Sequence, residues 1–216
     1  MVAITIGLII LGGTLQVFTA SKESFRLQEG VSRAQETGRM GIFILNRSLR
    51  HTGFYRNPSL VPSGFRIAFP AVAANGTTPA FLVGSAVSGT DGGGANPDLV
   101  AIRHQQHEDG TLLDCHGIVF DCMGNGGCNA NPVVNPVMGT FTFRLSPAAD
   151  VDTGTRSLQC RRLIPAAVPG GIDTGFQPLL EGVTDFQVWY GVDTDLGVSK
   201  DNIPNRFRSA DTMAAA

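Results

Sequence analysis

The sequence predicts an α+β protein, in which a long N-terminal helix packs on a C-terminal antiparallel β-sheet with long loops. The first fifty or so residues contain no proline, whereas glycine and proline, 27 and 12 in all, fall mostly after Gly53 and mark turns between short strands. Charged residues are only 16% of the 216, and the formal net charge of −2 excludes a strong overall attraction for nucleic acid. We expect three parts, residues 1–21, 22–52 and 53–216.

The first half of the predicted helix, residues 1–21, carries no charged side chain. Its length is about that needed to cross a hydrocarbon core of roughly 30 Å. Small and hydroxylated residues such as Gly13 and Thr14 are typical of membrane helices that contact another helix. Three alternatives follow: a cleaved secretory signal, a plain single-span anchor, and a helix that moves from a membrane into a bundle of helices. The uncharged start argues against the cleaved signal, which would begin with basic residues.

The second half, residues 22–52, has an amphipathic pattern. We predict that seven residues at spacings of three and four face the sheet: Leu27, Val31, Ala34, Gly38, Ile42, Leu45 and Leu49. Between residues 22 and 56, seven basic residues stand against three acidic ones, a net charge of +4. Such a face could bind nucleic acid or anionic lipid, although nothing else indicates nucleic acid. We favour a solvated face, or one that pairs with acidic residues of neighbouring subunits.

Three segments after Gly53, where the helix is expected to end, have the pattern of strands: Asp98–His104, Thr140–Leu145 and Ser157–Leu163. The second and third are predicted to form a hairpin, in which Phe141, Phe143 and Leu145 share one face.

A further alternating stretch runs from Leu179 to Asp193. Four of its residues are expected to face the helix, and two to point away: Val183, Phe186, Val188 and Tyr190 inward, and Gln187 and Trp189 outward.

Four cysteines follow the helix: Cys115, Cys122, Cys128 and Cys160. An even number in a chain with a membrane-directed segment favours disulfides formed in an oxidising compartment. Three pairings are possible, and we favour Cys115–Cys160 between two strands with Cys122–Cys128 closing a small loop. A zinc site is the alternative, but the chain lacks the C-x2-C pair that is usual in zinc fingers.

Metal ligands and catalytic groups are not indicated elsewhere. His104 and His107 would point to opposite faces of a strand, so we expect surface histidines at the end of a hairpin. The acidic residues Asp193, Asp195 and Asp201 lack the spacing of an EF-hand, so we expect a solvated turn rather than a calcium loop. The chain contains no G-x-S-x-G, H-E-x-x-H or P-loop motif. We therefore predict no enzyme, no catalytic residue, no metal site and no cofactor.

Two stretches carry a resemblance to a known family. The run MVAITIGLIILGGTLQVFTASKESFRLQEGVSRAQETGRMGIFILNRSLRHTGFY resembles the N-terminal helix of type IV minor pilins of the PilW family. The order QPLLEGVTDFQVWYGVDTD resembles their strand near the C-terminus. In that family a basic leader and a Phe-Thr-Leu-Ile-Glu-Leu-like segment precede the Met-Val-Ala at which this sequence starts, and one more strand follows the acidic turn. The resemblance therefore implies a sequence truncated at both ends.

The resemblance also implies a function. It implies a minor pilin-like structural subunit that primes type IV pilus assembly, and hence serves twitching motility, adhesion or DNA uptake. The implied partners are other major and minor pilins, bound through the N-terminal helix. Before assembly the chain would sit in the bacterial inner membrane with its globular domain in the periplasm, and afterwards in the extracellular pilus. The alternatives are a type II secretion pseudopilin and a single-span, membrane-anchored periplasmic sensor that binds a ligand.

Overall fold

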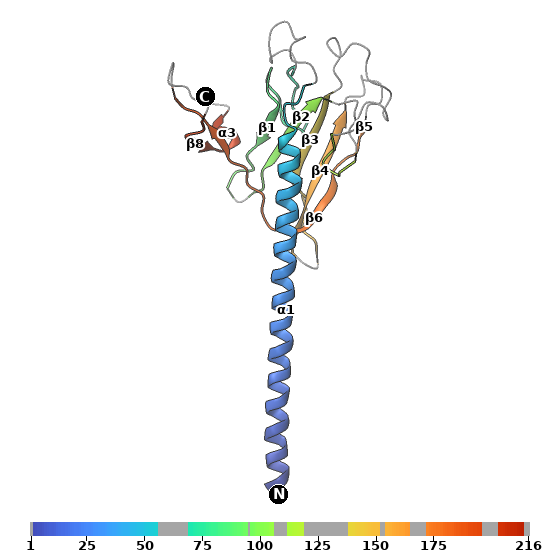
Figure 1. The fold of residues 1–216 in the computed structure, drawn as a ribbon, viewed down its shortest axis with the longest axis vertical. Helices are drawn as coiled ribbons and strands as arrows, with labels where there is room; N and C mark the ends of the chain where they lie inside the picture. Colours follow the sequence, from blue (N-terminus) through green and yellow to red (C-terminus); the bar gives the residue numbers. More distant parts are fainter. Residues whose placement is uncertain are drawn as a thin grey trace. The chain divides into compact units, whose positions relative to one another are not determined.

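The computed structural model describes residues 2–55, 69–94, 96–105, 112–118, 138–151, 154–164, 172–195 and 203–213. The chain divides into two compact units, Met1–Ile42 and Phe43–Ala216. Helix α1 (Val2–Arg50) forms the first unit and ends in the second, which also holds an antiparallel sheet (Figure 1). The α+β class that the sequence predicted is confirmed.

The end of α1 follows from local chemistry. Arg47 and Arg50 lie in the last turn, where positive charge is favourable beside the unpaired carbonyl groups. Gly53 then adopts a φ of 77°, a left-handed conformation that favours glycine. Its amide donates a hydrogen bond to the carbonyl oxygen of Arg103 at 3.0 Å, which connects the end of the helix to the sheet.

Among the described residues the main sheet has six strands: β1 (Val87–Thr90), β2 (Leu99–Gln105), β3 (Met138–Leu145), β4 (Arg156–Ile164), β5 (Ile172–Asp173) and β6 (Gln177–Val183). Their order is β1-β2-β3-β4-β5, with β6 also paired to β4, and every pair is antiparallel. Strands β2, β3 and β4 match the three predicted segments within one or two residues. The predicted β3–β4 hairpin is confirmed by a register that places Phe143 opposite Cys160.

A smaller sheet lies near the C-terminus. Strands β7 (Tyr190–Val192) and β8 (Arg206–Arg208) pair antiparallel, and the short helix α3 (Ala210–Met213) follows. Strand β8 follows the acidic turn at Asp193 and Asp195.

The hydrophobic core lies on one face of the main sheet. It is built by eight buried residues from α1, three strands and the segment before residue 119: Ile44, Val100, Ile102, Cys115, Phe141, Phe143, Cys160 and Ile164. The predicted alternation in β3 is confirmed, since Phe141, Phe143 and Leu145 are all nearly inaccessible to solvent. Phe186 and Val188 pack against the same cluster, and Gln187 and Trp189 are exposed, as the alternating pattern predicted.

The helix residues that meet the sheet differ from the predicted stripe. Within the last turns of α1, Ile44 and Ser48 are buried and Leu45 packs against the core, but Leu49 is 50% exposed. The prediction was therefore right for Leu45 and wrong for Leu49. The reason is that residues 42–45 are all apolar, so the pattern could not fix which side of the helix faces the sheet.

The other five residues of the predicted stripe belong to the first unit. Leu27, Val31 and Ile42 are 66%, 58% and 70% exposed, and Ala34 and Gly38 are exposed as well.

The opposite face of the main sheet is covered by a loop segment. Arg103 of β2 extends between the rings of Phe69 and Phe81, and its guanidinium donates to the carbonyl oxygens of Pro70, Leu82 and Ser85. Every residue of β2 from Val100 to Gln105 is buried for this reason, because both faces of the strand are covered.

Candidate functional site

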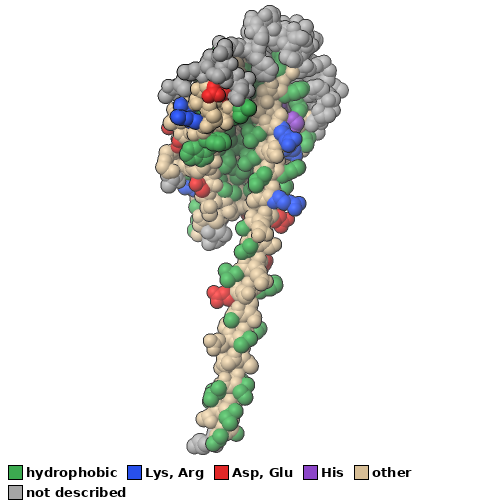
Figure 2. Space-filling model, turned by 60° about the vertical axis from the view of Figure 1, so that its left-hand side comes forward, with side chains coloured by type: hydrophobic (Ala, Val, Ile, Leu, Met, Phe, Trp, Pro, Cys, Tyr) green, Lys and Arg blue, Asp and Glu red, His purple; other side chains and the backbone are tan. Residues whose placement is uncertain are grey.

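The first candidate surface is the N-terminal part of α1. The helix contains a window apolar enough to cross a membrane, and none of that window is buried within the chain. Large side chains such as Leu8, Ile9 and Phe18 are between 66% and 74% exposed. Figure 2 shows this part of the helix free of basic and acidic side chains on the face that it presents. An exposed apolar surface of this extent needs an apolar environment outside the chain.

The threonine hydroxyl groups of this segment are satisfied within the helix. The hydroxyl groups of Thr5, Thr14 and Thr19 donate to backbone carbonyl oxygens three or four residues earlier. In lipid or in a helix bundle these side chains therefore present methyl groups rather than unpaired donors. Beside Thr14, a Cβ atom added at Gly12 or Gly13 would meet nothing within 4 Å, so another backbone can approach closely there.

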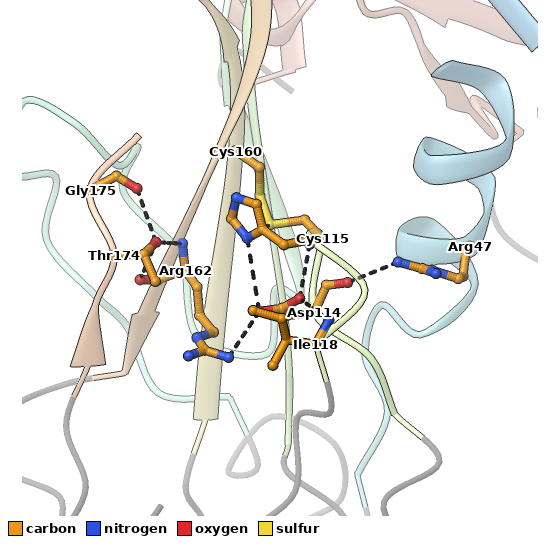
Figure 3. The surroundings of a disulfide bond; sticks show 9 residues. Arg47, Asp114, Cys115, Ile118, Cys160, Arg162, Thr174 and Gly175 are labelled. Atoms are coloured by element: carbon orange, nitrogen blue, oxygen red, sulfur yellow. Dashed lines mark hydrogen bonds and ion pairs between the residues drawn. A yellow bond between two sulfur atoms is a disulfide. The ribbon is translucent and has the colours of Figure 1, made fainter. Parts of the chain in front are cut away.

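The second candidate site is the junction between the end of α1, the loop at residues 112–118 and β4 (Figure 3). A disulfide joins Cys115 to Cys160, which confirms the favoured pairing of these two cysteines. Both are within the core. The neighbouring residue Asp114 is nearly inaccessible, and its carbonyl oxygen accepts a hydrogen bond from Arg47 of α1 at 3.1 Å.

The carboxylate of Asp114 is the electrostatic centre of this junction. Its Oδ2 accepts from Arg162 of β4 at 2.8 Å, and its Oδ1 accepts from the backbone amides of His116 and Ile118. Burial alone would raise the pKa of Asp114, but hydrogen bonding to His116 and Ile118 and the charge of Arg162 outweigh it and hold this pKa below its usual value. The loop, the disulfide and β4 are thus held together by a buried ion pair as well as by a covalent bond.

His104 corrects the expectation of a surface histidine. Its side chain is 2% exposed and its ring stacks on Phe141, with ring centroids 4.7 Å apart. Burial lowers the pKa of His104 to about 4, and the nearby His51 adds to this effect. The expectation was wrong because α1 and the residues after it cover this face of β2, which the local sequence cannot indicate. His107 lies outside the described residues.

A third group connects the C-terminal segment to the sheet. The buried carboxylate of Asp98 accepts from the backbone amides of Gly92 at 3.0 Å and Val188 at 2.7 Å, and the amide of Asp98 donates to the carbonyl oxygen of Phe186. The ring of Tyr190 lies over β1, where Gly89 leaves the space that it needs. Burial, and then the charge of Asp98, raise the pKa of Tyr190 to about 12.

The remaining predicted residues give no site. Asp193 and Asp195 form a turn in which Asp193 accepts from the amide of Asp195, and Asn205 donates to Asp195. No group of three or more His, Cys, Asp or Glu side chains suited to a metal occurs in the described part of the chain. Cys122, Cys128 and Asp201 fall outside it, so the second predicted disulfide and the third acid of the turn stay predictions.

Sequence reasoning missed Asp98, Asp114 and Arg162 as organising residues. Asp98 and Asp114 are lone charges, one before an apolar strand and one beside a cysteine, and this is the signal that could have singled them out. Arg162 carries no such signal, because it follows another arginine within its strand.

Comparison with known families gave a match to the end of the chain. The sequence model of the family described as Type IV Pilus-assembly protein W (PilW) matches residues 148–216, the last third of the chain. This segment contains β4 to α3, and with them Cys160, Arg162 and the stretch that reaches Asp98. No curated protein and no solved structure gave a match. The PilW resemblance named from the sequence is thus confirmed for residues 148–216, which are similar to this pilus-assembly family.

Proposed function

We propose that the chain is a minor pilin-like structural subunit that takes part in type IV pilus assembly, with no catalytic role. The observation that carries the proposal is that one chain combines a PilW-matching sheet segment with an exposed, uncharged apolar helix. In this proposal the pilus serves twitching motility, adhesion or DNA uptake.

The helix suits a subunit that exchanges one apolar environment for another. Its threonine hydroxyls are bonded internally and its glycines are open on the outside, so these residues can lie in lipid or against similar helices without unpaired hydroxyl groups. In this proposal the subunit first sits in the inner membrane with the sheet unit in the periplasm, and later packs among other major and minor pilins. The apolar surface of the helix serves both states. The disulfide is consistent with an oxidising compartment outside the cytoplasm.

The sheet unit suits display at a surface. Its links to the end of α1, through Arg47 and the core residue Ile44, attach it to the end of the helix that carries the basic residues rather than the uncharged segment. In the proposed subunit the apolar half of α1 is therefore available for assembly while the sheet remains in water.

The test uses the chain expressed from its native locus, so that its natural flanking sequence is retained. Deleting the gene is expected to reduce the number of surface filaments seen by electron microscopy, and the protein is expected in the filament fraction released by shearing. If the deletion strain kept normal filaments and the protein were absent from the sheared fraction, the proposal would fail.

Two substitutions to lysine separate the helix from the sheet unit. Leu11 is 61% exposed in the apolar segment, and Leu11→Lys should remove the protein from membranes and filaments, because a lysine at the centre of a membrane helix costs about 2.5–3.5 kcal/mol. Val151 is 98% exposed in the sheet unit, and Val151→Lys is the matched control. The control should localise like the unsubstituted protein. Equal loss of both variants would show that the helix surface has no special role.

A further inference from the structure

Arg144 of β3, on the loop-covered face of the main sheet, is a cation that has no hydrogen-bonded or anionic partner among the described residues. It points away from the core, because its neighbours Phe143 and Leu145 point into it. The Phe176 ring lies against it, with the guanidinium carbon 3.5 Å from the ring centroid. Its Nε is buried, yet among the described residues it finds no acceptor. The side chain as a whole is partly exposed, so its outer nitrogens can be reached from solvent.

Arg161, next to it on β4, shows what such a side chain binds. It lies near the same ring, with its guanidinium carbon 5.9 Å from the centroid of Phe176. Its Nε and one terminal nitrogen donate to the two carboxylate oxygens of Asp173, at 2.8 and 2.5 Å. This two-pronged geometry is the strong form of an arginine–carboxylate pair. Bonding to Asp173 raises the pKa of Arg161.

Arg144 has the same setting without the carboxylate. An aromatic ring on one face of a guanidinium leaves its edge for acceptors in the plane of the group. Gln159, opposite Arg144 in the ladder, does not fill that edge, since its Oε1 is buried and likewise lacks a hydrogen bond. Burial, and then the charge of Arg161, lower the pKa of Arg144, which is the direction expected of a cation whose charge is not compensated.

We propose that Arg144 is a carboxylate-binding site, in which Phe176 fixes the plane of the guanidinium and its edge receives the two oxygens. Since Asp173 neutralises Arg161, one positive charge is left at this place, which suits a singly charged carboxylate better than a phosphate. The carboxylate can be a small free anion or an acidic side chain of a polypeptide, and the test distinguishes these sources.

The experiment follows the arginine Nε–H signals by NMR in the full chain, labelled with 15N-arginine and held in detergent micelles at pH 7. Sodium acetate is titrated against sodium chloride at constant ionic strength. A second titration uses the peptide acetyl-Gly-Glu-Gly-amide, with acetyl-Gly-Gln-Gly-amide as its uncharged control. The signal that Arg144→Lys removes identifies Arg144. It should shift to saturation with acetate and with the glutamate peptide, and not with chloride or the glutamine peptide.

Arg161 provides the internal control. Its edge is occupied, so its signal should stay in place in the unsubstituted protein and should begin to respond to acetate in Asp173→Asn. Phe176→Leu should weaken acetate binding at the Arg144 signal by about two- to fivefold, the effect of losing a cation–π contact.

The titration of the unsubstituted protein, followed at the signal that Arg144→Lys removes, decides the proposal. An Arg144 signal that does not move, or that moves as much with chloride as with acetate, overturns it. Tighter binding of the glutamate peptide than of acetate would support the site and assign it to a polypeptide partner. Equal binding would support it as a site for a free carboxylate.

Discussion

Removing the disulfide between Cys115 and Cys160 should destabilise the sheet unit strongly. The two cysteines are 45 residues apart in sequence, and closing a loop of that length lowers the entropy of the unfolded chain by an amount worth about 4 kcal/mol at 25 °C. For a unit of this size each kcal/mol corresponds to about 2–4 °C in melting temperature, so Cys160→Ser should lower it by on the order of 10 °C. The hydroxyl adds to this loss, because Cys160 is 0% exposed in an apolar core.

The assay is differential scanning calorimetry of the full chain in detergent micelles, with and without a phosphine reductant. Cys160→Ser and the double variant Cys115→Ala/Cys160→Ala should both melt well below the unsubstituted protein in oxidising buffer. The double variant lacks the hydroxyl penalty but leaves a small cavity in the core, so its loss combines the covalent bond with the lost packing of two sulfur atoms. Adding reductant should lower the melting temperature of the unsubstituted protein towards that of the double variant, because the same bond is then broken.

The control is Cys122→Ser/Cys128→Ser, which keeps the Cys115–Cys160 bond and removes the other two thiols. Its melting temperature should still fall when reductant is added. The reasoning would be refuted if Cys160→Ser melted within about 1 °C of the unsubstituted protein, a shift far below the value worked out from the loop length. It would also be refuted if the control no longer responded to reductant, since the sensitive bond would then lie elsewhere.

Three further predictions concern the same unit. His104 has a pKa of about 4 in the folded chain and about 6.5 in the unfolded chain, so on acidification the unfolded state binds a proton first. The free energy of unfolding, measured in urea, should therefore fall by up to about 3 kcal/mol as the pH drops from 6.5 to 4. His104→Gln should reduce this dependence of stability on pH. A Cβ added at Gly89 would lie 2.1 Å from the hydroxyl of Tyr190 and 2.8 Å from a backbone oxygen. Gly89→Ala should therefore cost about 1–3 kcal/mol in urea unfolding, and adding Tyr190→Phe should recover part of it; equal stability of Gly89→Ala and its parent would contradict the packing described. Peptide mapping without reduction should recover Cys122 linked to Cys128, and recovery of two free thiols would exclude that bond.

The parts of the fold that the sequence predicted are those set by local pattern. Alternation identified the buried face of β3 through Phe141 and Phe143, and the long run without proline identified α1. The side of α1 that meets the sheet was not predictable, because four consecutive apolar residues include Ile44 and leave several orientations equally apolar. The exposure of His104 was predicted wrongly for a related reason, since its burial depends on contacts with segments that are distant in the sequence.

The candidate site was predictable only where chemistry restricts partners. Four cysteines allow three pairings, so the Cys115–Cys160 bond could be chosen from a short set. A buried ion pair such as Asp114–Arg162 joins residues 48 apart, and any of many acidic residues could have met that arginine. Asp98 was not predictable either, because it accepts hydrogen bonds from backbone amides, and the sequence does not indicate which amides will lie near it.

The family match begins at residue 148, and the main sheet is divided at that point between two stretches of sequence. Strands β1 to β3 lie before it, and β4 to β6 lie within it. The bond from Cys115 to Cys160, the ion pair from Asp114 to Arg162 and the hydrogen bond from Val188 to Asp98 all cross this division. The matched segment is therefore not a portable module. Grafted onto another upstream sequence, it would need a compatible third strand, a cysteine and two carboxylates at the places where this chain supplies them.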